Sequence, residues 1–321
     1  MTFVEQTRQT LLNSLAEVLP PSAEWTALDY PMHENCGDAA LYLGLEAAAA
    51  HVGARVVRNL DRVSFRRHLL RPDTLAVFQA GGNWGGLYPT HHQLRMRFLA
   101  ETKGRPAVQM PQSIEYADES RREELRRAVG EHGRFVLLVR DRRSFELARA
   151  DYDCEVRLVP DLAFSLGPLT RRPATVARVV QRRTDREASR TGGAEETFDW
   201  LQVEPFSRTG LLLAATRRVN AQQRRTAAAP VATLTNRLCR SLARTSLDRA
   251  VSLLSRGETV ITDRLHGHLI STLAGIPHVV VNDKFGKVKA LYDTWTHASD
   301  LSRFAANWDE AFAMAEDLRV G

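Results

Sequence analysis

The stretch Val260–Pro277, VITDRLHGHLISTLAGIP, places an arginine, two histidines and an aspartate between two apolar segments. Its first residues are apolar and β-branched, HLISTLA has helical composition, and Gly275 with Pro277 is typical of a helix end. We therefore predict a strand, a helix from Arg264 to Ala274 with Asp263 as its N-cap, and a second strand at HVVV. This order is the strand–helix–strand unit of a parallel sheet.

The predicted helix start is suited to binding an anion. N–H groups of a first helical turn have no helical partners, and the helix dipole is positive there. Arg264 would add a guanidinium that can hold a phosphate or carboxylate with two hydrogen bonds, and His266 would lie beside it. The alternative is that Arg264 pairs with a neighbouring acid while His266 is a hydrogen-bonded core residue.

A metal site is the other chemistry that this stretch suggests. Asp263, His266 and His268 are close in sequence, and His278 and Asp283 follow. On a helix, however, positions 266 and 268 point about 200° apart, so the two histidines cannot easily share one ion. We predict no metal site and expect His268 to pack behind the site.

The composition and the hydrophobic pattern predict similar strand and helix units along the whole chain. The 321 residues, 44% hydrophobic and 26% charged, are typical of a soluble globular protein with room for two domains. Strand-like apolar runs alternate with helix-period segments, which indicates an α/β fold with mostly parallel sheets. A composition shift at LTRRP predicts an N-terminal domain over 1–170 and a C-terminal domain over 171–321, with the last helix packing back on the first domain. We predict a polar loop over residues 186–196.

The charge balance is basic, with 44 Lys+Arg against 38 Asp+Glu and a sequence pI near 9.5. This balance favours an anionic substrate, a nucleic acid or an acidic membrane surface. Few aromatic residues are interleaved with the arginines, so we expect no nucleic-acid partner. The N-terminal segment lacks a continuous apolar core, which favours a cytoplasmic protein; contact with the inner face of a membrane is left open, although no amphipathic anchor is evident. The three cysteines form no CxxC pair, and reduced thiols are expected.

Six segments resemble, in consistent order, the polysaccharide pyruvyl transferase family. They are NCGDAALYLGLE, VFQAGGNW, PQSIEY, LLVRDRRSFELA, VPDLAF and TDRLHGHLISTLAGIPHVVVNDKFGKVKALYDTW. The resemblance implies two Rossmann-like domains arranged as in GT-B glycosyltransferases, with a cleft between them. It also implies transfer of the pyruvyl group of phosphoenolpyruvate to two hydroxyls of a sugar, forming a ketal, without a metal or organic cofactor. The acceptor would be a sugar or an oligosaccharide, lipid-linked or free, and the oligomeric state is open.

A donor that carries both a carboxylate and a phosphate calls for several cations in one cleft. Arg140 ends the apolar strand FVLLV, and Ser144 opens the next helix, so both are candidates for substrate binding. Lys287 follows the strand after the Arg264 helix, with Lys284 as its rival; similarity to the family favours Lys287. For each cation the alternative is a solvated surface side chain.

The acid and base of the predicted reaction come from the same segments. His266 is our candidate acid, because imidazolium titrates near neutrality. Asp38 follows Gly37 at a predicted helix start and is either a helix N-cap or a base that faces the acceptor.

Further candidates lie at strand ends. Gly81 and Gly82 with Asn83 end the strand LAVFQA and would let backbone approach a ligand, or form an ordinary turn. Asp161 is expected to orient Arg140 or cap the following turn.

Arg183 and Asp185 are assigned either to the acceptor side of the cleft or, by preference, to a solvated loop. Two other functions are alternatives for the chain as a whole. One is a nucleotide-sugar glycosyltransferase of GT-B architecture, and the other is a non-catalytic binder of acidic glycan or nucleic acid.

Overall fold

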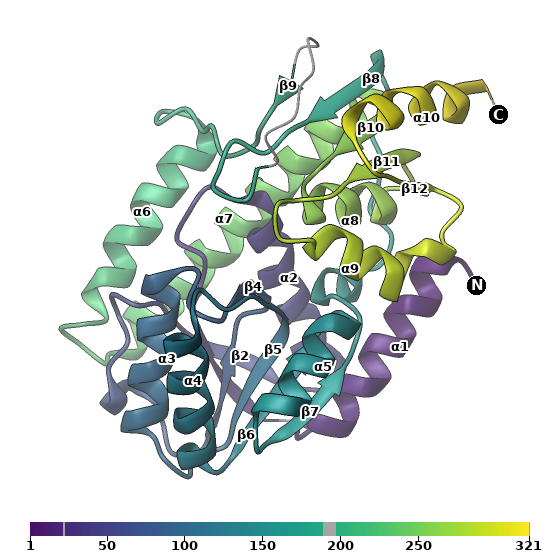
Figure 1. The fold of residues 1–321 in the computed structure, drawn as a ribbon. Helices are drawn as coiled ribbons and strands as arrows, with labels where there is room; N and C mark the ends of the chain where they lie inside the picture. The colour runs from purple at the N-terminus through teal and green to yellow at the C-terminus, as the bar shows by residue number, and fades with distance from the viewer. Residues whose placement is uncertain (22, 189–196, 321) are drawn as a thin grey trace.

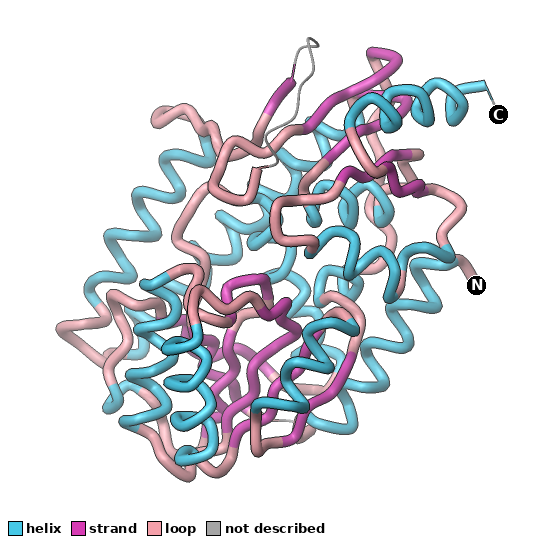
Figure 2. Tube along the Cα trace, in the orientation of Figure 1, coloured by secondary structure: helices cyan, strands magenta, loops and turns pink. Residues whose placement is uncertain are grey.

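Two parallel β-sheets, one in each half of the chain, organise the fold in the computed structural model (Figure 1). The structure describes residues 1–21, 23–188 and 197–320. The N-terminal sheet lies in the lower part of the view and the C-terminal sheet in the upper part, with helices around both (Figure 2). The prediction of an α/β fold with two parallel sheets is confirmed.

The N-terminal sheet has strand order β2-β1-β3-β5-β6-β7, with β4 pairing with β5 beyond the end of β3. These strands all pair in parallel. The carboxyl ends of the strands therefore share one edge of the sheet, where ligands of open α/β sheets bind. The strands are β1 (Glu24–Leu28), β2 (Arg55–Leu60), β3 (Thr74–Phe78), β4 (Gly81–Trp84), β5 (Ala107–Ile114), β6 (Phe135–Val139) and β7 (Glu155–Leu158).

Helices cover both faces of this sheet. Apolar side chains of α3, α4 and α5 form one core cluster with the sheet, and those of α1 and α2 belong to a larger cluster on the other side. The larger cluster continues into α8 of the C-terminal half, so one apolar core joins the two halves. The helices are α1 (Phe3–Val18), α2 (Cys36–His51), α3 (Pro89–Glu101), α4 (Glu119–His132) and α5 (Arg142–Asp151), with short 3-10 turns at Arg67–Leu69 and Leu162–Leu166.

The C-terminal sheet has order β12-β11-β10-β8-β9, again with parallel pairs. Its strands are β8 (Val176–Gln181), β9 (Thr197–Phe198), β10 (Gly257–Thr262), β11 (His278–Val281) and β12 (Ser302–Ala305). Its helices are α8 (Leu265–Leu273), α9 (Lys287–Thr294) and α10 (Trp308–Val320), with a 3-10 turn at Thr296–Ala298. The opening stretch of the sequence is thus β10, α8 and the approach to β11, as predicted.

A hairpin of two long helices, α6 (Arg208–Gln222) and α7 (Ala229–Ser255), connects β9 to β10 and lies along the side of both halves (Figure 1). Helix α7 packs against α2 and β2 of the N-terminal half and also contacts α8. Residues that follow position 170 therefore cover part of the N-terminal sheet. The last strand of the N-terminal sheet ends at Leu158, and the first strand of the C-terminal sheet begins at Val176. The domain boundary at 170 stays a prediction.

The last helix is placed differently from the expectation. Helix α10 packs against β10, β11 and β12, and its Trp308, Ala311 and Ala315 form a core cluster with those strands. The expected packing of this helix on the N-terminal domain is therefore not what the structure shows. The apolar face of α10 packs on its own sheet and covers a side of it that would otherwise be exposed to solvent.

Candidate functional site

A pocket of about 300 Å³ opens where the carboxyl ends of the two sheets face one another. Residues of both halves line it, among them Arg140 and Gly82 from the N-terminal half and Arg264, His266 and Lys287 from the C-terminal half. Its size is at the lower end of the range for small-molecule sites. The cations predicted to meet in one cleft do share a cavity.

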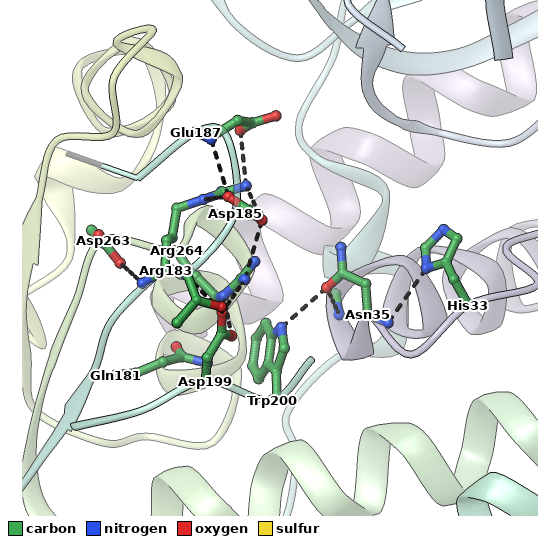
Figure 3. Close-up of polar contacts among 12 residues, drawn as sticks. His33, Asn35, Gln181, Arg183, Asp185, Glu187, Asp199, Trp200, Asp263 and Arg264 are labelled. Carbon is green, nitrogen blue, oxygen red and sulfur yellow. Dashed lines mark hydrogen bonds and ion pairs between the residues drawn. The ribbon is translucent and has the colours of Figure 1, made fainter. Parts of the chain in front are cut away.

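Arg264 follows β10 and is the N-cap residue of α8. The residue is 2% exposed, and its guanidinium donates from Nε to Asp199 Oδ1 (2.7 Å) and from Nη2 to Asp199 Oδ2 (2.6 Å). Nη2 also reaches Asp185 Oδ2 at 3.2 Å, so two acids hold this arginine (Figure 3). The alternative prediction, that Arg264 pairs with an acid, is therefore what the structure shows, and the same side chain lines the pocket. Nη1 has no hydrogen bond among the described residues and is free for a ligand.

Asp263 is not the N-cap that the sequence predicted. Its Oδ1 accepts from the Arg183 backbone N–H (2.8 Å), and the Arg264 N–H is bonded instead by Thr262 Oγ1 (3.0 Å). Helix α8 starts one residue later than expected, which leaves the Asp263 carboxyl buried beneath the pocket. Burial raises the pKa of Asp263 to about 6.

Asp263 should therefore make stability depend on pH. Because its folded pKa of about 6 lies above the usual value of 3.8, its contribution to stability is present at low pH and is lost as pH rises through 6. Between pH 4 and pH 7 we expect the unfolding free energy of the unmodified protein to fall by up to about 3 kcal/mol relative to Asp263→Asn. Urea unfolding of both proteins across this range measures the difference, and a pH-independent difference contradicts it.

Arg140 follows β6 of the opposite half and is likewise buried, 2% exposed. It donates from Nη1 to Asp161 Oδ2 (2.6 Å) and from Nε to Ser113 Oγ (3.0 Å). Asp161 Oδ1 also accepts from the Ala163 N–H (2.8 Å), so this carboxylate both orients the arginine and caps the following turn. Burial opposes ionisation, but Arg140 and His266 hold the pKa of Asp161 well below its usual range.

Lys287 and Arg140 approach the same point of the pocket from different halves. A β-carbon built on Gly82 would lie 3.2 Å from Arg140 Nη2 and 3.4 Å from Lys287 Nζ. Lys287 Nζ donates to the Gly82 carbonyl (3.1 Å) and to Glu187 Oε1 (3.0 Å). Lys284 is exposed and does not line the pocket, so the geometry separates the two lysines.

The segment 183–187 forms part of the pocket wall. The preferred prediction, that Arg183 and Asp185 lie in a solvated loop, is therefore wrong. Arg183 pairs with Asp185 and with Glu187 Oε2 (3.0 Å), and it lines the pocket. Tyr88 of the N-terminal half donates to Glu187 Oε1, and the Arg186 guanidinium donates to the Leu87 carbonyl. The segment therefore bridges the two halves at the rim. The rest of the predicted polar loop, 189–196, lies outside the described residues.

His266 is the second residue of α8, and its side chain lines the pocket. Its Nε2 lies 3.7 Å from Asp161 Oδ2 and has no hydrogen-bond partner among the described residues. The ring packs against Gly37, where an added β-carbon would be 2.6 Å from Nδ1. The start of α2 thus fixes the imidazole, and its Nε2 is buried beside Asp161 without a hydrogen bond among the described residues.

Gly37→Ala should therefore damage the site. The new methyl group would overlap the His266 ring, which packs with its Cβ and Cγ only 2.7 Å from the built position and cannot move aside freely. We expect a loss of activity of roughly tenfold or more. Gly130→Ala is the control, because that glycine, in α4, has nothing within 4 Å of its built β-carbon. Equal activity of the two variants in a turnover assay would contradict this contact.

Asp38 lies in the first turn of α2, and the N-cap is Asn35. Asn35 Oδ1 accepts from the Gly37 N–H (3.1 Å) and from Trp200 Nε1 (3.1 Å), while Asn35 Nδ2 donates to Asp38 Oδ2 (2.8 Å). His33 Nε2 is 3.4 Å from the same oxygen. The prediction that Asp38 is a helix N-cap is therefore wrong. Its role as a base stays a prediction, supported by its place in the pocket.

A pair of a buried aspartate and a half-buried histidine, which the sequence did not suggest, lies on the N-terminal wall. Asp29, just after β1, has φ 66°, which is rare for a residue other than glycine. Its Oδ1 bonds His91 Nδ1 (2.7 Å), and its Oδ2 lies 3.3 Å from Arg95 Nη2. Burial opposes protonation of the imidazole, but the Asp29 carboxylate raises the pKa of His91. Asn83, which also lines the pocket, donates to Asp29 Oδ2 at 3.4 Å.

Three other candidates lie away from the pocket surface. Ser144 is buried, and its hydroxyl accepts from the Ile114 N–H (2.8 Å), so it joins α5 to β5. Gly81 is not among the lining residues, although its positive φ of 148° shapes the turn that presents Gly82. His268 is buried between His278 (2.6 Å) and Thr296 (2.7 Å), as expected for a packing residue.

The fold and the pocket define a class: an α/β enzyme that binds a small ligand between two parallel sheets. The family model for polysaccharide pyruvyl transferase matches residues 35–284. The chain belongs to the polysaccharide pyruvyl transferase family and is a transferase.

Two relatives agree with this assignment, and a solved structure shares the fold. EpsO of Bacillus subtilis (strain 168), described as a candidate pyruvyl transferase, is 29% identical over 88% of this chain and 89% of its own length. Pyruvyl transferase 1 of Schizosaccharomyces pombe is 29% identical over 85% of this chain and 70% of its own. The crystal structure of an uncharacterised protein from Klebsiella pneumoniae superposes with a TM-score of 0.61 at 17% identity, over 96% of this chain and all of that one, which shows a shared fold.

Proposed function

We propose that the protein transfers the pyruvyl group of phosphoenolpyruvate to two hydroxyls of a sugar in a glycan or glycan precursor. The observation that carries the proposal is the meeting of Arg140, Arg264 and Lys287 with His266 in one pocket. A small molecule with a carboxylate and a phosphate matches cations that approach from two sides.

Internal acids position these cations before a ligand arrives. Arg140 is held by Asp161, Arg264 by Asp199, and Lys287 by Glu187. Nη2 of Arg140 and Nη1 of Arg264 have no hydrogen bond among the described residues, and these N–H groups would hold the two anionic groups of the donor. Preorganised donors of this kind stabilise developing charge without moving during the reaction.

The reaction starts with a proton from His266 to the methylene carbon of phosphoenolpyruvate, which turns that carbon into a methyl group and leaves a cation at the neighbouring carbon. A sugar hydroxyl adds to the cation and loses its proton to a base, for which Asp38 is our candidate and His91 a second. The carbon–oxygen bond to phosphate then breaks, with Lys287 stabilising the leaving group. A second hydroxyl adds, loses its proton and closes the ketal.

The test is a donor screen with the purified protein. Phosphoenolpyruvate is offered with a panel of galactose-, glucose- and mannosamine-containing acceptors, and released phosphate is measured together with the product mass. We expect phosphate release matched by the mass increase of a pyruvyl ketal. Turnover of nucleotide sugars instead would replace the proposal with a glycosyltransferase, and binding of acidic glycans without turnover of any donor would replace it with a binding protein.

A further inference from the structure

The helical hairpin α6–α7 has an unusual charge pattern. Between Pro205 and Leu247 the sequence contains eight arginines and no aspartate, glutamate or lysine. In the pocket, by contrast, every arginine and lysine is paired with an acid. The hairpin arginines are Arg208, Arg217, Arg218, Arg224, Arg225, Arg237, Arg240 and Arg244.

Most of this charge is unneutralised on the surface. All eight arginines are exposed except Arg240, which is half-buried. Arg217 lies 3.5 Å from Glu34, and Arg240 pairs with Glu46. Among the described residues, the other six have no acid within ion-pair distance. A concentrated, unpaired positive surface attracts an anionic partner over a Debye length.

Apolar side chains project from the same hairpin. Five large apolar residues are exposed in the described part of the chain, and three of them are Phe206, Leu211 and Leu234. Phe206 directly precedes Ser207, the N-cap of α6, and from there it could pack on Leu211 as a hydrophobic staple. It is instead 90% exposed, and Leu211 is 56% exposed, so this pair is not used to stabilise the helix end.

The turn between the two helices forms a small arginine-lined cavity. Arg66, Arg224 and Arg225 line a hollow of about 220 Å³ together with the end of α6. Carbonyl groups of Val63 and Phe65 hold the Arg66 guanidinium. Three guanidinium groups around one hollow match a phosphate group.

We propose that the outer face of the α6–α7 hairpin docks on a bilayer that carries anionic phospholipid. The arginines would contact the headgroup phosphates, and Phe206, Leu211 and Leu234 would enter the boundary of the acyl region. A nucleic acid fits less well, because Phe206 is the single aromatic residue between Pro205 and Leu247 and the exposed leucines offer no stacking surface.

The hairpin also adjoins the pocket. Arg217 of α6 donates to the Met32 carbonyl, in the segment whose neighbours His33 and Glu34 line the pocket. Docking of this face would hold the pocket rim near the bilayer, where a lipid-linked acceptor would be presented. Vesicle binding by the hairpin is independent of which donor the pocket takes.

The experiment is flotation of the full chain with vesicles of phosphatidylcholine, with or without phosphatidylglycerol. The test variant carries Arg208→Ala, Arg218→Ala, Arg224→Ala and Arg225→Ala. The control variant removes the same charge from the opposite side of the N-terminal sheet by Arg126→Ala, Arg127→Ala, Arg134→Ala and Arg149→Ala, all exposed. A single-stranded RNA oligonucleotide serves as the second anionic probe.

We expect binding to the anionic vesicles alone, weakened by salt, and at least tenfold weaker in the test variant, because each arginine near an anionic surface contributes roughly a fivefold gain. The control variant should bind nearly as tightly as the unmodified protein. Absence of anionic-vesicle binding at low salt, an equal loss in both variants, or binding of the RNA without binding of the vesicles would each overturn the proposal.

Discussion

Replacement of Arg264 by alanine is expected to abolish pyruvyl transfer and to lower the free energy of unfolding by roughly 3–5 kcal/mol. The reason for the second effect is Asp199, whose carboxylate is fully buried and accepts two hydrogen bonds from the guanidinium. Without Arg264 this buried charge has no cationic partner among the described residues. Urea unfolding measures the stability, and phosphate release from phosphoenolpyruvate measures the transfer.

A double variant separates the two effects. Arg264→Met with Asp199→Asn removes the arginine and the buried negative charge together, while the asparagine oxygen can still accept from the Thr184 N–H and hydroxyl. We expect most of the stability to return but no activity, because the ligand would still lack its guanidinium. Recovery of activity along with stability would show that Arg264 has only a structural role.

His266→Gln is expected to have the opposite profile, with a fall in kcat of about 10²–10⁴-fold and little change in stability. Glutamine cannot supply the proton for the methylene carbon. Asp161, the acid beside His266 Nε2, keeps its hydrogen bonds from Arg140 and from the Ala163 N–H when His266 is replaced. Steady-state kinetics should show KM for phosphoenolpyruvate changing far less than kcat.

The matched control for His266→Gln is the same substitution at His268. That residue is buried in the hydrogen bonds with His278 and Thr296 and does not line the pocket. His268→Gln should lower stability through those bonds while retaining the proton transfer. If His266→Gln turned over at nearly the normal rate, another group would be the acid.

The strand-to-helix unit at β10 and α8 could be predicted because its signals are local. A β-branched run, a helical composition and a Gly-x-Pro end follow one another within 18 residues, and the positions of Arg264 and His266 follow directly. Arg140 could be placed in the same way, at the end of an apolar strand. Parallel strands then bring such residues to one edge of each sheet.

The acids that hold these cations could not be predicted in the same way. Asp199 and Glu187 come from segments with no regular pattern, and their partners lie 65 and 100 residues away in sequence. Asp29 and His91 meet only because β1 and the start of α3 converge on the pocket. The full length of α7 could not be predicted either, since α7 packs on α2 and β2 of the other half rather than following a local signal.

The surplus of positive charge in the sequence is unevenly distributed over the structure. Paired acids balance the cations of the pocket, so the surplus that the sequence shows is not mainly that of the binding site. Much of it lies on the α6–α7 hairpin, where eight arginines have no acid in the same stretch. Net charge alone predicts an anionic partner, and our two proposals assign anions to two separate places, the pocket and the hairpin.

The most direct test of the account is a calorimetric titration of phosphoenolpyruvate into the unmodified protein and two folded double variants. One is Arg264→Met with Asp199→Asn, and the other is Arg140→Met with Asp161→Asn, in which the asparagine can still accept from Ala163. We predict one bound donor per chain in the unmodified protein and at least a tenfold loss of affinity in each variant, since the two arginines come from opposite halves and hold the same molecule. Unchanged affinity in either folded variant would contradict a donor site shared between the two halves.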